Sequence, residues 1–270
     1  MTPEAERRAW LDVALAICDE ADATALRHFR RDVRVSAKPD RTLVTEADTA
    51  IERMARDRIA AAWPGHGIVG EEYGIEAGDA PVRWYVDPID ATHNFVRGVP
   101  LFGTLLAVER GGELEVGVVS APALGERWYA WRGGGAWGIG GAGADEGPRP
   151  LRVSRVSTLE DAHVLYGSGR DIIASGRAPG FEALLAAAWR DRGFGDFWGY
   201  ALVAQGAADV MVEVDLNPWD AAAPAAIIEE AGGHWSDIDG RRRIDAGTFV
   251  ATNGLLHDEV LARLTQGGSD

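Results

Sequence analysis

Cysteine is almost absent from this 270-residue sequence, which contains only Cys18. A single cysteine excludes an intrachain disulfide. Cys18 lies between Trp10 and Phe29, in an apolar stretch with helical spacing. We therefore expect a buried, small apolar side chain at this position rather than a reactive thiol.

Positive charge is also scarce, because 27 Lys and Arg residues stand against 42 Asp and Glu residues, a net charge of −15. Such a balance disfavours nucleic acids and anionic membranes as partners. No apolar run is long enough to span a bilayer, and residues 1–8 lack the apolar core of a signal peptide. We expect a soluble, cytoplasmic protein.

Several catalytic signatures are missing as well. The sequence has no Gly-x-Ser-x-Gly motif and no P-loop, and none of its six histidines forms a pair at metal-ligand spacing. It also has no cysteine nucleophile with a histidine partner. Acids and backbone donors remain, and these are the parts of a mechanism that uses a metal ion and water.

The hydrophobic content of 46% and the 34 glycines suit an α/β protein with many turns, built as one large domain or two that share a core. Periodicity predicts the elements of the N-terminal half. Helices are expected over 4–30 and 48–63, and strands over 42–45, 83–86, 101–109, 114–120 and 127–131.

A Gly-rich stretch, 133–147, is expected to be an irregular loop dividing an N-terminal α+β half (1–150) from a C-terminal α/β half (151–270). Residues 150–153 are expected to return to the first sheet. The C-terminal half alternates strands and helices, closing a cleft over the metal-binding acids of the first half. Strands are expected over 162–166, near 194, and over 209–214 and 248–252, with helices over 180–190, 197–206, 219–231 and 257–265.

Residues 84–95 carry the strongest functional signal. An apolar strand runs into Asp87 and Asp90, with a proline between them and a helix start after them. Two converging carboxylates suit Mg²⁺, and the backbone N–H groups of Ala91 and Thr92 at a helix N-terminus suit phosphate. The alternative is structural: a proline turn followed by an aspartate N-cap.

A second acidic group, Gly70-Glu71-Glu72, follows another short apolar strand. Most such pairs are solvated surface charges. Here Asp87 lies only 16 residues beyond Glu71, so two strand ends on one sheet edge would bring these carboxylates and Asp90 together. Between the aspartates, Ile89 could contribute its backbone carbonyl as a hard ligand, whatever its side chain does.

Other acids allow both readings. Asp220 opens the helix predicted over 219–231, and Glu213 and Asp215 border it at a strand end. Asp220 could be a helix-capping acid or, if the two halves face each other, a metal ligand. Asp48 resembles a capping partner of Thr45, or it could order a catalytic water or a third metal ion.

These motifs share one order along the chain. They are Thr45-Glu46-Ala47-Asp48, Gly70-Glu71-Glu72, the Asp87 to Phe95 segment, and Trp219-Asp220 followed by Glu230-Ala231-Gly232-Gly233. Their order and spacing resemble the inositol monophosphatase family across roughly the whole chain. The resemblance implies a layered αβαβα sandwich and a homodimer. It also implies hydrolysis of small phosphate monoesters with two or three Mg²⁺ ions, with Mn²⁺ as a possible substitute, and frequent inhibition by Li⁺.

The resemblance also implies roles for individual residues. Metal ligands would be Glu71, Asp87, the Ile89 carbonyl, Asp90 and Asp220. Glu71 and Thr92 would orient the attacking water, and the amides of Ala91 and Thr92 would hold phosphate. The family usually has glycine where this chain has Ala91, and a methyl group fits there only if the backbone is not at positive φ. We expect Ala91 to affect rate more than reaction type.

Within the family, the sequence resembles the bacterial histidinol-phosphatase branch in four segments. They are 92–98, 120–125, 192–198 and 251–254. A cationic leaving alcohol needs an acid on the substrate side, for which Asp196 is the candidate, with Glu213 or Asp215 as helpers. Asp196 could instead be a turn acid before the following helix. The residues expected to contact substrate are Glu71, Ile89, Asp90, Ala91, Thr92, Arg192, Asp196, Glu213 and Asp220.

The prediction is therefore a Mg²⁺-dependent phosphomonoesterase acting on L-histidinol phosphate. One alternative is an inositol-1-phosphatase or a broad sugar-phosphate phosphatase. A second, of another class, is a non-catalytic regulatory or binding protein on the same fold. The intact set of acids favours catalysis.

Overall fold

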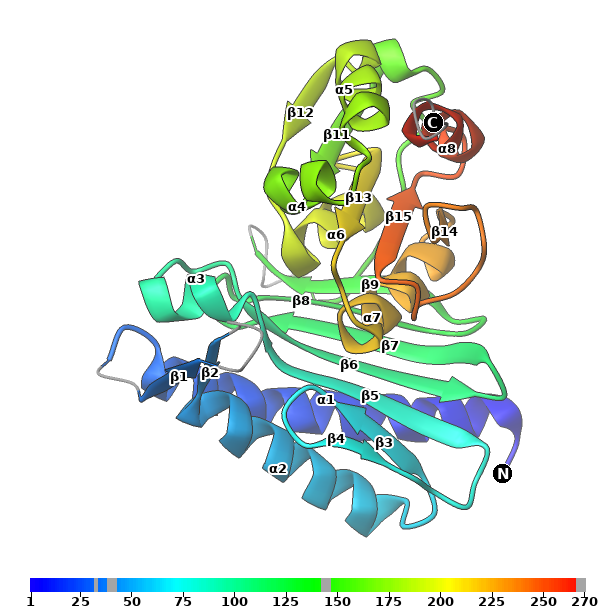
Figure 1. Cartoon of the computed structure of the whole chain (residues 1–270). Coiled ribbons are helices and arrows are strands. Elements are labelled where there is room, and N and C mark those ends of the chain that lie inside the picture. The colour runs from blue at the N-terminus through cyan, green and yellow to red at the C-terminus, as the bar shows by residue number, and fades with distance from the viewer. Residues whose placement is uncertain (32–33, 38–42, 142–146, 266–270) are drawn as a thin grey trace.

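The computed structural model describes residues 1–31, 34–37, 43–141 and 147–265. Its helices and sheets stack in alternating layers, from a helical pair at one side to a group of short helices at the other (Figure 1). This is the layered α/β arrangement expected. In the described part of the chain, no helix is long and apolar enough to cross a membrane.

The first layer consists of two long helices, α1 (Pro3–His28) and α2 (Glu46–Ala62). Both begin at a threonine N-cap, Thr2 and Thr45, whose hydroxyl accepts a backbone N–H of the first turn. Their apolar faces pack on the sheet around Trp10 and Trp84, both fully buried. Cys18 is buried in the same cluster, as expected.

The second layer is an eight-stranded sheet with the order β10-β9-β8-β7-β6-β5-β3-β4. Only the β3–β5 pair is parallel, and this pair brings two strand ends to the same edge. The strands are β3 (Gly67–Gly70), β4 (Gly74–Glu76), β5 (Val82–Asp90), β6 (Gly103–Arg110), β7 (Glu113–Ala121), β8 (Glu126–Trp131), β9 (Gly135–Gly140) and β10 (Arg149–Pro150). Beside them, β1 (Val35–Ala37) and β2 (Leu43–Thr45) form a separate two-stranded antiparallel sheet, and α3 (Thr92–Arg97) follows β5.

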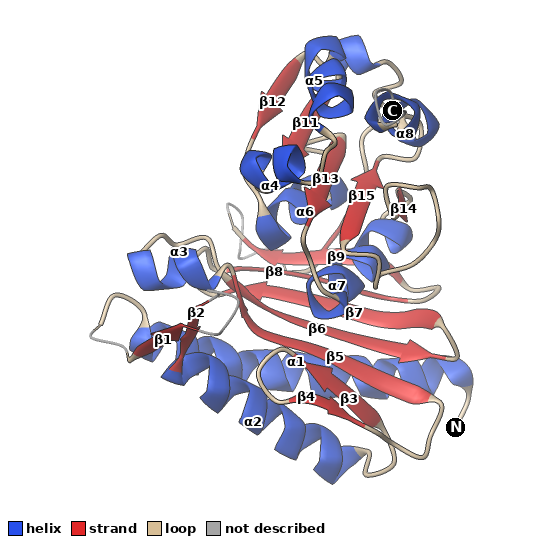
Figure 2. Ribbon diagram, viewed as in Figure 1, coloured by secondary structure: helices blue, strands red, loops and turns tan. Residues whose placement is uncertain are grey.

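The middle layer contains α6 (Asp196–Ala204) and α7 (Pro218–Glu230), which lie between the two sheets (Figure 2). Close approach of α7 to the first sheet depends on Gly117 of β7, where a Cβ atom would lie 2.6 Å from the carbonyl oxygen of Ala223. The alanine-rich face of α7 completes this contact. One apolar cluster therefore runs from the first sheet through α7 to the second sheet.

The second sheet has the order β12-β11-β13-β15-β14, and three short helices cover its outer face. The strands are β11 (His163–Tyr166), β12 (Arg190–Arg192), β13 (Val210–Val214), β14 (His234–Ser236) and β15 (Thr248–Thr252). The helices are α4 (Gly169–Ala174), α5 (Ala178–Ala187) and α8 (His257–Leu264). A third apolar cluster fills the space between them.

Most predicted elements are confirmed within a few residues, and the Gly-rich stretch is the main exception. Gly135–Gly140 is not an irregular loop but the strand β9, which pairs with β8 along its whole length. Its glycines are tolerated because the neighbouring strand and α7 supply the packing. Residues 142–146 of the predicted loop lie outside the described residues. The expected return to the first sheet is made by Arg149–Pro150.

Candidate active site

The site begins at the end of β5, where Asp87 and Asp90 flank an irregularity in the β5–β6 pairing. Regular pairing ends at Asp87 and resumes at Asp90, so the two carboxylates escape strict alternation and converge. Pro88 suits this break because it has no N–H to donate. Its carbonyl oxygen accepts the Thr104 hydroxyl at 2.8 Å, which fixes the irregular segment. Asp87 is 1% exposed.

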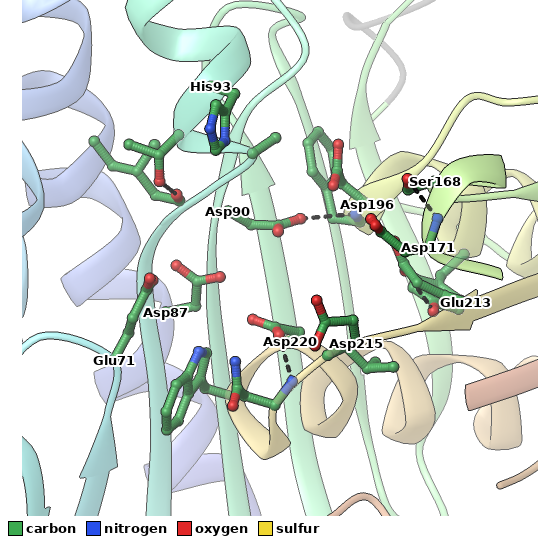
Figure 3. Close-up of a pocket in the computed structure, with 18 of the residues that line it drawn as sticks. Glu71, Asp87, Asp90, His93, Ser168, Asp171, Asp196, Glu213, Asp215 and Asp220 are labelled. Atoms are coloured by element: carbon green, nitrogen blue, oxygen red, sulfur yellow. Dashed lines mark hydrogen bonds between the residues drawn. The ribbon is translucent and has the colours of Figure 1, made fainter. Parts of the chain in front are cut away.

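Glu71 lies at the end of β3, directly beside Asp87. In the parallel β3–β5 register Gly70 pairs with Val86, and the Glu71 amide donates to the Val86 carbonyl at 3.2 Å. The next residues of both strands therefore emerge together, as Figure 3 shows. The predicted meeting of Glu71, Asp87 and Asp90 at one sheet edge is confirmed.

Asp220 reaches the same point from the middle layer. It is in the first turn of α7, where its carboxylate accepts the Asn217 amide at 2.6 Å, so the capping role is confirmed. One carboxylate oxygen from each of Asp87, Asp90 and Asp220 lies within 4.8 Å of the other two. The two readings of Asp220 are compatible, because one oxygen can cap the helix while the other faces the cluster.

Electrostatics favour a cation at this cluster. Burial, reinforced by repulsion from Glu71 and Asp90, raises the pKa of Asp87 well above its usual range. Burial likewise raises the pKa of Asp220 to about 7. The Oδ1 atom of Asp87 is buried and has no hydrogen-bond partner among the described residues. An all-oxygen donor set with an unpartnered buried carboxylate oxygen fits a hard divalent ion such as Mg²⁺.

The segment after Asp90 holds Ala91 at φ 63° and ψ 46°, in the left-handed region. This corrects the expectation that alanine would be accommodated without positive φ: the backbone adopts the conformation that usually favours glycine and is strained by the methyl group. Ala91 precedes α3, and the first helical bonds run from Asn94 and Phe95 to its carbonyl. The amides of Thr92 and His93 therefore precede the hydrogen-bonded part of the helix.

Two further groups support this segment. The Thr92 hydroxyl donates to the Ile89 carbonyl at 3.0 Å, which leaves a second lone pair of that carbonyl for another partner. The Ile89 side chain has a structural role, because it is 1% exposed and packs with Phe95 and Phe102 in a small core next to the site. That anchor fixes where the Ile89 carbonyl lies.

Asp48 is buried and close enough to Glu71 and Asp87 for their charges to interact. It forms the predicted capping box, accepting the Thr45 amide at 2.8 Å as well as the Thr45 hydroxyl. Burial raises the pKa of Asp48 to about 6, with a contribution from Glu71. Its Oδ1 atom has no partner in the described structure. Asp48 is not among the described residues that line the cavity.

The opposite wall of the cavity also carries acids. The cavity has a volume of about 360 Å³; Asp171, Asp196 and Glu213 line the side away from Glu71 and Asp87, and Asp215 lies beside Asp220 (Figure 3). Burial, followed by repulsion from Asp196, raises the pKa of Glu213 to about 8, and the Tyr200 hydroxyl donates to Glu213 at 2.7 Å. This side of the cavity therefore carries several carboxylates in addition to those of the candidate metal site.

Asp196 belongs to this wall and not to a helix cap. The N-cap of α6 is Gly195, and Asp196 is its first residue, with a positive φ of 50°. Burial raises the pKa of Asp196, and the charge of nearby His93 opposes that rise. The two walls are joined through the backbone, because Asp90 accepts the Phe197 amide at 2.7 Å.

Arg192 was expected to contact substrate, but the structure does not bring it to the cavity. It is exposed at the end of β12, and its guanidinium donates to the neighbouring carbonyl of Asp191 at 2.6 Å. Sequence reasoning in turn missed Ser168, Asp171 and Tyr200, which line the cavity together with His93. The signal for Ser168 and Asp171 was a helix start after β11, since the Ser168 hydroxyl accepts the Asp171 amide.

Comparison with known proteins agrees with this geometry. The sequence profile of the inositol monophosphatase family matches residues 6–269. A histidinol-phosphatase from Streptomyces coelicolor is 45% identical over 95% of this chain and 97% of its own length. A histidinol-phosphatase from Mycobacterium tuberculosis is 44% identical, covering 95% of this chain and 98% of its own.

Among solved structures, an IMPase from Thermotoga maritima superposes with a TM-score of 0.84 at 34% identity, over 96% of this chain and 98% of the other. The profile match, the close relatives and the layered fold agree from end to end. The chain belongs to the inositol monophosphatase family.

Proposed function

We propose that this protein is a Mg²⁺-dependent phosphomonoesterase that releases phosphate from L-histidinol phosphate. The observation that carries the proposal is the division of the cavity into two acidic walls. One wall, Glu71, Asp87, Asp90 and Asp220, suits metal ions. The acids of the other wall would bind a cationic group of the substrate. The relatives named histidinol-phosphatase support histidinol phosphate as that substrate.

The leaving alcohol explains the second wall. Histidinol carries an ammonium group and an imidazole, whereas inositol and sugar alcohols present only neutral hydroxyls. Burial raises the pKa values of Asp196 and Glu213, and repulsion from Asp196 adds to the rise at Glu213, so a cation beside them would stabilise their charged forms. A polyol would leave the same charges unpaired at a free-energy cost.

The residues of the metal wall would bind Mg²⁺ and place the reacting groups. Asp87, Asp90 and Asp220, with Glu71 and the Ile89 carbonyl, would hold the ions. When bound, Mg²⁺ would neutralise phosphate charge and acidify the attacking water. Because the Thr92 hydroxyl donates its proton to Ile89, it can only accept a hydrogen bond from that water.

The other residues would orient water and phosphate. Glu71 would accept a hydrogen bond from the other hydrogen of the water. The two hydrogen bonds together would direct a lone pair of the water oxygen at phosphorus. The amides of Ala91 and Thr92 would donate to the phosphate. Asp48, held by Thr45, would keep a negative charge behind Glu71.

Three further features belong to the proposal. We infer two or three Mg²⁺ ions, because five candidate ligands exceed what one octahedral ion with bound water and phosphate needs. We also propose a homodimer and a cytoplasmic location. Sedimentation at several protein concentrations would test the dimer.

A phosphate-release panel tests the substrate assignment. With Mg²⁺, kcat/KM should be largest for histidinol phosphate, with inositol 1-phosphate and fructose 1,6-bisphosphate at least about tenfold lower, the effect of one unpaired buried charge. A preference for inositol 1-phosphate would favour the alternative phosphatase. No phosphate release from any of the three would favour the non-catalytic alternative.

A further inference from the structure

A buried glutamate outside the cavity contacts the turn that carries Glu71. Glu52 of α2 is 0% exposed, and its carboxylate accepts the backbone amides of Glu72 at 2.6 Å and Tyr73 at 3.1 Å. The Arg56 guanidinium donates to the same carboxylate at 2.9 Å. A buried carboxylate is costly unless charge and hydrogen bonds compensate it, and here three donors do so.

The position of Gly70 shows how closely Glu52 approaches the chain. A Cβ atom built on Gly70 would lie 2.0 Å from Glu52 Oε1 and 2.8 Å from an Arg56 nitrogen. No side chain fits there unless the buried pair moves. The glycine of the Gly70-Glu71-Glu72 motif is thus explained by the carboxylate beneath it, since its φ is not positive.

Arg56 extends the same contact to the far side of the hairpin. Besides Glu52, it donates to the Gly74 carbonyl at the start of β4 and pairs with Glu76 at 3.3 Å. The turn is thus held at its amides by Glu52 and at its following carbonyl by Arg56. Glu71 lies between this fixed turn and the β3–β5 pairing, where its own amide donates to Val86.

We propose that Glu52 is a positioning residue, which sets the affinity of the metal site by holding the Glu71 carboxylate in place. The inference rests on the proposed function, because that function assigns Glu71 to the metal ions. Glu52 itself does not line the cavity among the described residues, so it acts through the backbone of the turn. Outer groups that orient a ligand commonly change metal affinity by about 10–100-fold when they are replaced.

The test is Glu52→Gln, which preserves volume but places an NH₂ group against N–H donors. We expect the Mg²⁺ dissociation constant, measured by calorimetry on the metal-free protein, to rise about tenfold, or about 1.4 kcal/mol. The Mg²⁺ concentration for half-maximal phosphatase activity should rise equally, with kcat largely restored at saturating Mg²⁺. An unchanged dissociation constant beside a lower melting temperature would overturn the proposal, because Glu52 would then support only the fold.

Glu76→Gln is the matched control. The Glu76 side chain is 64% exposed and is another carboxylate partner of Arg56. Its replacement leaves both turn amides bonded to Glu52. Its Mg²⁺ dissociation constant should change less than about twofold. An equal rise in both variants would contradict the proposal, because the effect would then follow Arg56 pairing in general.

Two further measurements make the outcome decisive. On a Glu71→Gln background, Glu52→Gln should add little to the loss of Mg²⁺ affinity, and a fully additive loss would contradict action through Glu71. If Glu52→Gln does not fold, Glu52→Asp replaces it, with an expected rise of roughly threefold because the shorter side chain draws the carboxylate away from the Glu72 and Tyr73 amides. Unchanged affinity in a folded Glu52→Asp would then contradict the proposal.

Failure of the proposed function gives a different result. A wild-type protein that binds Mg²⁺ but leaves histidinol phosphate intact would remove the substrate assignment. The calorimetric comparison of Glu52→Gln with Glu76→Gln would still decide the role of Glu52.

Discussion

The two walls of the cavity come from different parts of the chain and are built differently. Glu71, Asp87 and Asp90 lie at ends of paired strands, where backbone hydrogen bonds and a buried core fix each position. Asp196 and Asp215 lie on a helix start and a loop, both at positive φ. Glu213 of the second wall lies within β13, so only part of that wall is built on connections, which can vary without loss of a sheet.

Strain distinguishes the walls from the rest of the molecule. Among the described residues, the non-glycine residues at positive φ are Arg30, Ala91, Asp196 and Asp215, and all but Arg30 line the cavity. Such residues persist only where surrounding structure holds them, and they gather at functional sites. Asp220, from the second half, is the exception that crosses between walls, because α7 packs closely on Gly117 of the first sheet.

Metal removal should produce the largest effect, because the proposed reaction depends on the ions that the first wall would hold. The second wall should be left in place. EDTA should abolish phosphate release, and added Mg²⁺ should restore it. The melting temperature should rise with Mg²⁺, since an ion that binds only the folded state stabilises it. Full activity in metal-free buffer would mean that the first wall is not a metal site.

Asp90→Asn should lower kcat by roughly a hundredfold or more at saturating Mg²⁺, the scale of a lost metal or preorganised electrostatic contact. Circular dichroism should show an intact fold, because the amide oxygen can still accept the Phe197 amide. Near-normal turnover would reduce Asp90 to a link between the two halves.

Asp196→Asn should lower kcat/KM for histidinol phosphate by about ten- to a hundredfold, since a charge-assisted hydrogen bond contributes roughly 1.5–3 kcal/mol. Asparagine tolerates the positive φ at this position, so the backbone should be unchanged. Inositol 1-phosphate hydrolysis should change little. Equal losses on both substrates would place Asp196 with the metal wall or the fold.

The second half should also respond to acid through a buried histidine. His257 bonds Ser236 and Thr252, and burial lowers its pKa from 6.5 to about 4. Below pH 6.5 the histidine of the unfolded chain takes up a proton, whereas His257 in the folded chain stays neutral until about pH 4. The contribution of neutral His257 to the free energy of unfolding is therefore complete above pH 6.5 and is lost as pH falls toward 4. At pH 5 the loss is about 2 kcal/mol.

Urea unfolding at pH 7.5 and pH 5 checks this prediction against a His257→Asn control. The wild type should lose more stability on acidification than the variant does. The raised pKa values of the cavity acids act in the opposite direction, but they are common to both proteins and cancel in the comparison. Equal losses would show that His257 titrates normally.

Ala91→Gly should have the smallest effect. Relief of the left-handed backbone favours the variant by roughly 1 kcal/mol, and the added freedom of the unfolded chain offsets about half of it. Thermal unfolding should therefore show a rise of about 1–2 °C. Ala50→Gly, at an exposed position within α2, should lower stability instead, and a similar loss in Ala91→Gly would mean that the methyl group is not strained.

Sequence reasoning reached the metal wall more fully than the substrate wall, for a physical reason. Acids at the ends of apolar strands are placed by strand pairing, and periodicity reveals the strands. The proximity of Glu71, Asp87 and Asp90 could therefore be predicted from the sequence. Asp220 required the contact between α7 and Gly117, which no local pattern encodes. Asp171 depends on a six-residue helix, α4, that was not predicted. Arg192, at the end of the edge strand β12, is not among the described residues that line the cavity, and a sequence motif does not show on which side of an edge strand a side chain lies.

Glycine-rich segments were the other source of error. The composition of Gly135–Gly140 favours a loop, yet pairing with β8 makes it a strand. Pairing with the preceding strand, from which only residues 132–134 separate it, overrode the composition there. At Ala91 a non-glycine residue adopts the left-handed backbone that local preference disfavours.

The ratio of kcat/KM for histidinol phosphate to that for inositol 1-phosphate, measured in the wild type, Asp90→Asn and Asp196→Asn, tests the separation of the two walls most directly. Loss of a metal-wall acid should slow both substrates together and leave the ratio within about threefold of the wild type, whereas Asp196→Asn should lower it by about tenfold or more. A ratio that falls in Asp90→Asn and holds in Asp196→Asn would contradict the assignment of metal binding and substrate recognition to separate walls.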